Sequence, residues 1–235
     1  MQNIIIASTS TLHNSGYLNY ILDDLKLFFK KANTILFIPY ARPSGISHDD
    51  YTNKVSEAFS EIDKKVKGIH EFENPIEAII NAEAIFVGGG NTFVLTTQLY
   101  KNNLIKELKS TIKKGIPYLG TSAGSNICGL TIKTTNDMPI VYPPNFNALG
   151  LVPFNINPHY LDPDLGSKHM GETRETRIKE FHNFNTQPVI GLREGSWLHV
   201  KDDSIILNGS LTARIFEYNK TPYEIETGSE LNHLK

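Results

Sequence analysis

Residues 116–128 read IPYLGTSAGSNIC, and the organisation of the chain can be worked out from this stretch. The apolar run at its start is typical of a buried strand, small residues follow, and residues 125–128 can begin a helix. Ser122 therefore falls at a strand-to-helix turn, flanked by Gly120 and Gly124. Such a turn strains the backbone of its central residue, and a Cβ at either glycine would collide with the neighbouring strand or helix. We expect the Ser122 hydroxyl to project freely at the carboxyl end of the strand.

This arrangement is a nucleophile elbow, and it suits acyl transfer. The following helix would direct its unpaired N–H groups and the positive end of its dipole at charge that develops beside the serine. The pattern G-x-S-x-G is weak by itself, because it should arise by chance in roughly one chain in ten of this length. A tight glycine-rich turn is the alternative, and the surrounding sequence has to decide between them.

Composition limits the class of protein. The chain has 235 residues, of which 40% are hydrophobic and 20% charged, and this predicts a single α/β domain over residues 1–235. The net charge is −2 and the sequence pI is about 6.4, without a basic run longer than a lysine pair, so we expect no nucleic-acid partner. A small molecule is the expected partner, bound by a monomer or a homodimer.

Cysteine content and the first residues bear on location. Cys128 is the single cysteine, which excludes an internal disulfide, and we expect it to be a small buried apolar residue. The start MQNIIIAST lacks the basic and apolar regions of a signal peptide, and no run approaches the ~20 apolar residues of a membrane span. We therefore expect a cytoplasmic protein without a membrane partner.

The first half of the chain alternates between strand and helix patterns. Apolar runs predict strands buried on both faces at residues 3–7, 34–39, 84–87 and 116–119. Helical spacing predicts helices at residues 17–31, 51–62, 75–82, from 93 onward, and 104–114. This order favours a doubly wound, mostly parallel sheet flanked by helices, with a ligand site at the carboxyl ends of the strands.

A second glycine-rich loop, GGGNT at residues 88–92, lies at that same edge of the sheet. Strand, glycines and helix together present backbone N–H groups to an anion. The loop has neither the G-x-x-x-x-G-K-[ST] pattern of a phosphate loop nor the G-x-G-x-x-G pattern of a dinucleotide site. It could bind an anionic ligand, or it could form an oxyanion hole for Ser122.

Beyond Leu130 the chain changes character. Residues 131–160 are rich in Pro and Asn, and such a segment can fold over a site and supply polar groups. A helix is expected at residues 173–184 and a strand at 189–192. The tail from Ser196 alternates apolar and polar residues across turns, which predicts a C-terminal antiparallel β extension.

A serine nucleophile needs a base within hydrogen-bond reach and a carboxylate that orients the base. Of the eight histidines, His159 follows an apolar stretch at a proline-fixed turn, which makes it the preferred candidate for the base, and a purely structural histidine is the alternative at this position. Asp137, in a loop, and Glu194, after the strand at 189–192, compete for the third position. Glu194 is preferred because it lies at the carboxyl end of a strand.

Six motifs in this order carry a family resemblance that spans nearly the whole chain: GGGNTF, TSAGSN, TTNDMPIV, NINPH, GETRETRI and GLREG. They resemble the peptidase E family, the aspartyl dipeptidases of the bacterial cytoplasm. The resemblance implies a serine exopeptidase that cleaves dipeptides with an N-terminal aspartate, on a fold similar to class I glutamine amidotransferases. It implies no cofactor.

By this resemblance Ser122 matches the nucleophile, His159 the base and Glu194 the third member. Asp137 matches an aspartate that has also been considered for that third place. The backbone donors of the oxyanion hole match Gly90 and Ala123.

The same resemblance matches Arg174 to the arginine that binds the aspartyl carboxylate of the substrate. Two departures from the family pattern are a slightly longer stretch at residues 160–170, which bears on the placing of Arg174, and Thr121, where some relatives would have a bulkier residue.

Two other functions stay open at this point. One is a related serine peptidase that acts on β-aspartyl, cyanophycin-type bonds. The other is a non-catalytic protein that holds an anionic metabolite in the GGGNT loop. A metal site is not expected, because no His, Cys or acidic residues have a recognisable ligand spacing.

Overall fold

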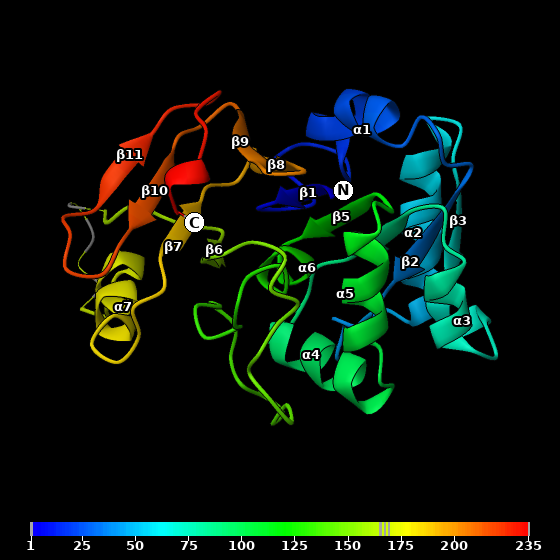
Figure 1. Cartoon of the computed structure of the whole chain (residues 1–235), viewed down its shortest axis with the longest axis horizontal. Coiled ribbons are helices and arrows are strands. Elements are labelled where there is room, and N and C mark those ends of the chain that lie inside the picture. The colour runs from blue at the N-terminus through cyan, green and yellow to red at the C-terminus, as the bar shows by residue number, and fades with distance from the viewer. Residues whose placement is uncertain (1, 165, 167, 169, 235) are drawn as a thin grey trace.

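The computed structural model describes residues 2–164, 166, 168 and 170–234. Its main sheet consists of β1 (Asn3–Ala7), β2 (Thr34–Ile38), β3 (Lys65–Gly68), β4 (Ile85–Val87), β5 (Tyr118–Thr121), β8 (Ser196–Lys201) and β9 (Ser204–Gly209). These strands lie in the order β3-β2-β4-β5-β1-β8-β9, and Figure 1 shows the sheet with β3 at one edge and the β8–β9 hairpin at the other. The first five are parallel, whereas β8 and β9 add an antiparallel hairpin beside β1. The expected doubly wound α/β fold is confirmed.

Helices cover both faces of this sheet: α1 (Leu22–Phe28), α2 (His48–Ser60), α3 (Pro75–Ile80), α4 (Thr92–Lys101) and α5 (Ile105–Lys113). Successive strand residues point to opposite faces. Ile5 and Phe37 accordingly pack with α1 and α2, whereas Ile4 and Leu36 pack with α3, α4 and α5. Two separate apolar cores therefore hold the central strands, which explains why the sequence of each strand is a continuous apolar run.

The helix after β5 is shorter than the sequence suggests. α6 (Ala123–Asn126) has only four residues, so the expected contribution of a helix dipole is small. Cys128 follows α6 instead of lying within a longer helix. It is fully buried, as expected, and burial raises the pKa of its thiol to about 12.

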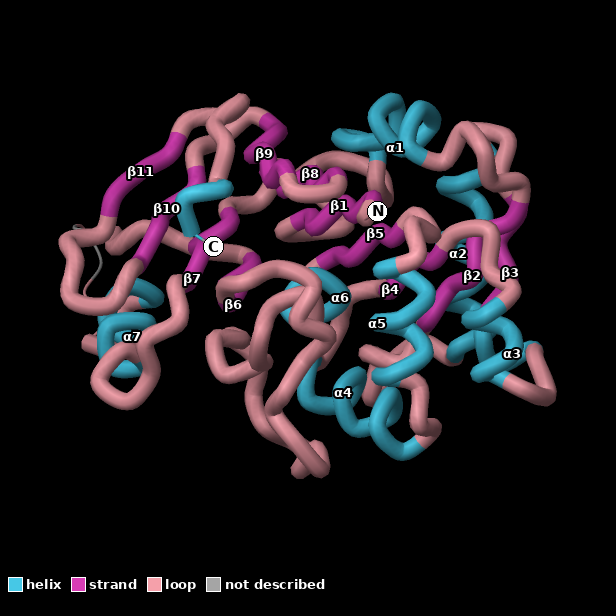
Figure 2. Tube along the Cα trace, viewed as in Figure 1, coloured by secondary structure: helices cyan, strands magenta, loops and turns pink. Residues whose placement is uncertain are grey.

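A second sheet stands beside the first, and Figure 2 shows it next to a long stretch of loop. Its strands are β6 (Asn155–Pro158), β7 (Val189–Leu192), β10 (Ala213–Phe216) and β11 (Tyr223–Ile225). They lie in the order β11-β10-β7-β6, with β6 and β7 parallel. One face adds Ile156 and Ile190 to the main core, and the other packs Val189 and Phe216 against Ile178 of α7 (Arg174–Phe181).

Three features of the fold differ from the sequence-based expectation. The tail divides between the two sheets, because β8 and β9 extend the main sheet while β10 and β11 join the second. Strand β3 was not predicted, since its sequence KVKG has two exposed lysines at a sheet edge. The helix expected at residues 17–31 is shorter, because Leu18 adopts a left-handed conformation with φ of 61° and a single 3-10 turn precedes α1.

The 3-10 turn before α1 is Asn19–Ile21, and two others lie at Ile69–Glu71 and Asn232–Leu234. Along the part of the chain that the structure describes, no helix is long and apolar enough to cross a membrane.

Candidate active site

Ser122 occupies the turn between β5 and α6 in a rarely populated backbone conformation. Its φ is 53° and its ψ is −110°, and such a conformation costs about 1–3 kcal/mol. A Cβ on Gly124 would overlap the carbonyl of Val87 on the neighbouring strand, and one on Gly120 would overlap the carbonyl of Gly124. The strained serine and the need for both glycines are as the sequence predicts.

The Ser122 hydroxyl meets His159 and, through it, Glu194. The distance from Ser122 Oγ to His159 Nε2 is 2.8 Å, and the distance from His159 Nδ1 to Glu194 Oε1 is 2.6 Å. The His159 and Glu194 side chains are 34% and 46% exposed, so both groups reach solvent. A neutral His159 that donates from Nδ1 to the carboxylate presents Nε2 as the acceptor for the serine proton.

His159 comes from the second sheet, and its backbone is fixed by a residue of the first. It follows β6 with a φ of 54°, a left-handed conformation that histidine tolerates better than most residues. Its N–H donates to Ser8 Oγ at 2.8 Å, and the Ser8 hydroxyl donates to the carbonyl of Leu192 at 2.7 Å. Ser8 thus joins the ends of β1, β6 and β7. Sequence reasoning missed it, although its place directly after a buried strand was a usable signal.

Asp137, the competing carboxylate, is engaged elsewhere. Its Oδ2 accepts a hydrogen bond from the Thr92 N–H at 2.7 Å and another from Thr135 Oγ1 at 3.0 Å. It therefore caps the first turn of α4, where negative charge is favourable. Within the described residues it forms no hydrogen bond with His159, whereas Glu194 does.

The glycine loop after β4 lies against the serine. A Cβ on Gly89 would come within 3.0 Å of the Ser122 Cβ, and one on Gly90 would overlap the carbonyl of Ala41. The Asn91 N–H donates to that same carbonyl at 2.7 Å, which ties the loop to the end of β2. Among the described residues, none accepts a hydrogen bond from the N–H of Gly90 or of Ala123. Both N–H groups can serve an oxygen of a ligand.

Arg174 begins α7, whose first turn is capped by Thr173 through a hydrogen bond from the Thr176 N–H at 3.1 Å. Burial lowers the pKa of the half-buried Arg174, the charge of Arg177 adds to this, and Asp137 opposes it. In the described part of the chain no carboxylate lies within ion-pair distance of Arg174. The guanidinium therefore stands near Asp137, without a direct ion pair among the described residues.

The acidic neighbour of Arg174 has other partners. Glu175 pairs with Lys179 at 2.7 Å and with Arg214 at 3.1 Å, and among the described residues it forms no ion pair with Arg174. The hydrogen bond from Lys179 is the main cause of a lowered pKa at Glu175. Of the eight histidines, His169 lies outside the described residues.

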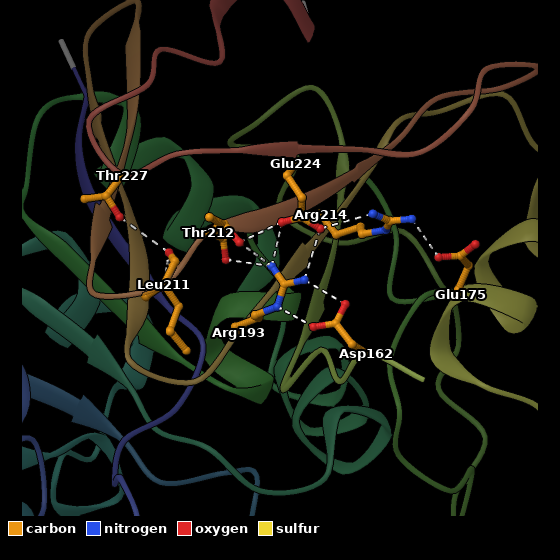
Figure 3. Close-up of polar contacts among 9 residues, drawn as sticks. Asp162, Glu175, Arg193, Leu211, Thr212, Arg214, Glu224 and Thr227 are labelled. Atoms are coloured by element: carbon orange, nitrogen blue, oxygen red, sulfur yellow. Dashed lines mark hydrogen bonds and ion pairs between the residues drawn. The ribbon is translucent and has the colours of Figure 1, made fainter. Parts of the chain in front are cut away.

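An ion-pair network links the residue after β7, Arg193, to α7 (Figure 3). The sequence did not reveal this network. Arg193 binds both oxygens of Asp162, at 2.9 and 2.7 Å, and both oxygens of Glu224, at 2.8 and 3.1 Å. Arg214 in turn bridges Glu224 and Glu175. Burial alone would raise the pKa of Glu224, but hydrogen bonds from Arg193, Thr212 and Arg214 lower it to about 2.

Comparison with known proteins identifies the family. The model of peptidase family S51 matches residues 4–208. The chain belongs to peptidase family S51. It is therefore a serine-type peptidase, as the elbow and the resemblance predicted.

Individual relatives match almost the whole chain. A protein named peptidase E from Streptomyces coelicolor is 47% identical over 232 residues, covering 99% of this chain and 94% of its own. A protein named probable alpha-aspartyl dipeptidase from Drosophila melanogaster is 44% identical, with 99% and 97% covered. The crystal structure of a peptidase from an acI-B1 actinobacterium has a TM-score of 0.73 at 15% identity, covering 98% of this chain and 96% of that one, and it shares the fold.

Proposed function

We propose that this S51 peptidase hydrolyses dipeptides with an N-terminal aspartate, through an acyl-enzyme on Ser122. The observation that carries the proposal is the continuous hydrogen-bonded series Ser122 Oγ, His159 and Glu194, with distances of 2.8 and 2.6 Å. The names of the relatives with 44–47% identity support the substrate class.

In the first half of the reaction, His159 Nε2 removes the Ser122 proton as Oγ attacks the scissile carbonyl carbon. Glu194 holds the Nδ1–H and stabilises the imidazolium that forms. The carbonyl oxygen becomes an oxyanion, for which the N–H groups of Gly90 and Ala123 are the proposed donors. As the C–N bond breaks, His159 gives its proton to the leaving amine, and the aspartyl group stays on Ser122 as an ester.

In the second half, water replaces the amine. His159 takes a proton from the water as its oxygen attacks the ester carbonyl, and the same two N–H groups stabilise the second oxyanion. Collapse of this intermediate breaks the bond to Ser122 Oγ, which recovers its proton from His159. Aspartate leaves and the free serine is restored.

Arg174 is the proposed partner of the substrate's aspartyl side chain. Burial of that carboxylate without a partner would cost several kcal/mol, and a planar guanidinium can meet both of its oxygens. The lowered pKa of Arg174 and its lack of a carboxylate within ion-pair distance in the described chain fit a group that awaits an anion.

A panel of dipeptides tests the proposed function. Wild type and Ser122→Ala are assayed side by side on Asp-Leu, β-Asp-Leu and Asn-Leu. We expect rapid cleavage of Asp-Leu by wild type, weak cleavage of Asn-Leu, and none by Ser122→Ala. Preferential cleavage of β-Asp-Leu would transfer the chain to the β-aspartyl class, and an inert wild type that binds an anionic metabolite would favour the non-catalytic alternative.

We further infer that the reaction takes place in the cytoplasm, on a monomer or a homodimer, with a small peptide as the only partner. Cell fractionation followed by light scattering of the purified chain tests both points. A membrane-bound pool or a larger assembly would contradict them.

A further inference from the structure

A dipeptide with an N-terminal aspartate carries two carboxylates, and Arg174 accounts for only one of them. The free α-carboxylate of the second residue also has to approach the site, and its solvation has to be replaced. We propose that Arg42 binds this α-carboxylate and so selects dipeptides over longer or amidated substrates. This inference rests on the proposed function and deepens it.

Arg42 lies just beyond the end of β2, next to Ala41, whose carbonyl accepts the hydrogen bond from Asn91 that ties down the glycine loop. Its Cζ lies 5.0 Å from the centre of the Tyr51 ring, a cation–π contact. The Tyr51 hydroxyl donates to the carbonyl of Gly89 at 3.2 Å, and Gly89 packs directly on Ser122. Arg42 is thus connected to the proposed nucleophile through one aromatic ring and one glycine.

The two arginines are associated with opposite faces of the main sheet. Tyr51, under Arg42, belongs to the core between the sheet and helices α1 and α2. Arg174 stands near Asp137, which caps α4 on the other face. In an extended Asp-Xaa dipeptide six bonds separate the two carboxylate carbons, a span of roughly 7 Å. A substrate with its scissile carbonyl at Ser122 can therefore present one carboxylate to each face.

The charge of Arg42 is available to a ligand. The side chain is exposed, and among the described residues no carboxylate lies within ion-pair distance of it. The aromatic side chains beside it are uncharged tyrosines, since the Tyr17 hydroxyl lies 3.3 Å from that of Tyr51 and tyrosine is protonated at neutral pH. A planar guanidinium held over a ring can offer two parallel N–H groups to a carboxylate.

The aromatic cluster of Tyr17 and Tyr51 also provides a matched control for Arg42. Lys54 lies 5.3 Å from the centre of the Tyr17 ring, so it is also an exposed cation on this aromatic cluster. It extends from α2 and has no contact with the glycine loop. Removal of its charge changes the local potential without touching the proposed carboxylate site.

The test compares Asp-Leu with Asp-Leu-amide, which lacks only the α-carboxylate charge. We expect wild type to prefer Asp-Leu, and Arg42→Met to lower kcat/KM for Asp-Leu by roughly 10- to 100-fold with less than a twofold change for the amide. Arg42→Lys should recover part of the loss, and Lys54→Met should behave like wild type. Arg174→Met should instead lower kcat/KM for both substrates, because both contain the aspartyl side chain.

Each contrary result has one meaning. Equal losses on Asp-Leu and its amide in Arg42→Met would show that Arg42 only supports Tyr51 and the glycine loop, and the proposal would be wrong. So would a wild-type enzyme that cleaves both substrates equally well. A wild type that cleaves neither substrate would instead overturn the dipeptidase function itself.

Discussion

The two sheets of this chain are stabilised in different ways, and each supplies a different part of the site. The parallel part of the main sheet is buried between two apolar cores, and it carries Ser122 and the glycine loop on backbone that glycine packing holds in place. The second sheet has a small apolar cluster on its outer face and the ion-pair network of Arg193, and it carries His159 and Glu194.

This difference teaches how the site is assembled. The proposed nucleophile and oxyanion donors depend on a rigid core, whereas the proposed base and its carboxylate depend on how the second sheet docks through Ser8 and how charges fix its outer edge. Loss of Ser122 or of His159 should therefore abolish the chemistry outright, whereas changes to residues that only position the second sheet should degrade it by degrees.

The largest effect is expected from Ser122→Ala. Loss of the only group that forms the acyl-enzyme should lower kcat on Asp-Leu by about 10⁴- to 10⁶-fold. The melting temperature should stay close to that of wild type, because the alanine keeps the Cβ and the backbone conformation. His159→Ala should be similarly inactive, and the double variant no worse than either single one, since the two residues act as a unit. A folded Ser122→Ala enzyme with a tenth of wild-type activity would end the covalent mechanism.

The next comparison separates the two carboxylates. Glu194→Gln should lower kcat by more than about 10²-fold, because an amide no longer enforces the tautomer of His159. Asp137→Asn should cost less activity, and it should lower the free energy of unfolding by about 1 kcal/mol through the weakened cap of α4. Steady-state kinetics and urea unfolding on both variants measure these effects. A reversed ranking in kcat would give the third position to Asp137.

Arg174→Met tests how the site distinguishes aspartyl from asparaginyl substrates. We expect kcat/KM for Asp-Leu to fall by about 10²-fold, with little change in the weak cleavage of Asn-Leu, since only the first substrate offers the side-chain carboxylate. The two kcat/KM values are measured with the same enzyme preparation. Equal losses on both substrates would mean that Arg174 supports α7 instead of reading the substrate.

The smallest effect concerns the ion-pair network. Glu224→Gln should weaken the contacts of both Arg193 and Arg214. We expect kcat/KM to fall by about tenfold. The free energy of unfolding should fall by only about 1 kcal/mol, because the Glu224 side chain is 35% exposed. Glu217→Gln is the matched control, because Glu217 pairs with Lys220 and has no contact with Arg193. A loss of stability without any change in kcat/KM would separate the network from the site.

Glu224→Gln should also change how the free energy of unfolding depends on pH. The pKa of Glu224 falls from its usual 4.5 to about 2 in the folded chain, so the folded state binds this proton more weakly than the unfolded state does. The stability that Glu224 contributes is fully present above about pH 4.5 and is lost as the pH falls toward 2. Glu224→Gln should therefore flatten the decline of unfolding free energy in this window, and an unchanged decline would contradict the assignment.

The main sheet could be predicted from sequence because β1, β2 and β4 are mostly apolar runs buried on both faces, and the strand expected at residues 116–119 overlaps β5. Only part of the second sheet could be predicted. Strand β7 forms at residues 189–192 as expected, but β6 reads NINP and pairs with β7 across a loop and a helix, so only pairing between distant residues defines the sheet. Strand β3 was missed because two of its four residues are exposed lysines.

The site was partly predictable for the same reasons. Ser122 could be recognised from the glycines on either side, and His159 and Glu194 from their places after apolar segments, with support from the family resemblance. The contacts made by Ser8 and Arg193 could not be found in this way. Ser8 contacts residues more than 150 positions away. Arg193 binds Asp162 and Glu224 directly and is linked to Glu175 through Glu224 and Arg214, so the network joins carboxylates from three separate segments.

The central claim is that Ser122 of the main sheet and His159 of the second sheet form one nucleophilic unit, and covalent labelling measures this directly. Wild type, Ser122→Ala and His159→Ala are treated with a serine-directed fluorophosphonate and followed by intact-mass and peptide mass spectrometry. We predict a single adduct on the Ser122 peptide of wild type, none on Ser122→Ala, and labelling of His159→Ala slowed by at least ~10²-fold. Equal labelling of wild type and Ser122→Ala, or an unlabelled wild type that still cleaves Asp-Leu, would contradict the claim.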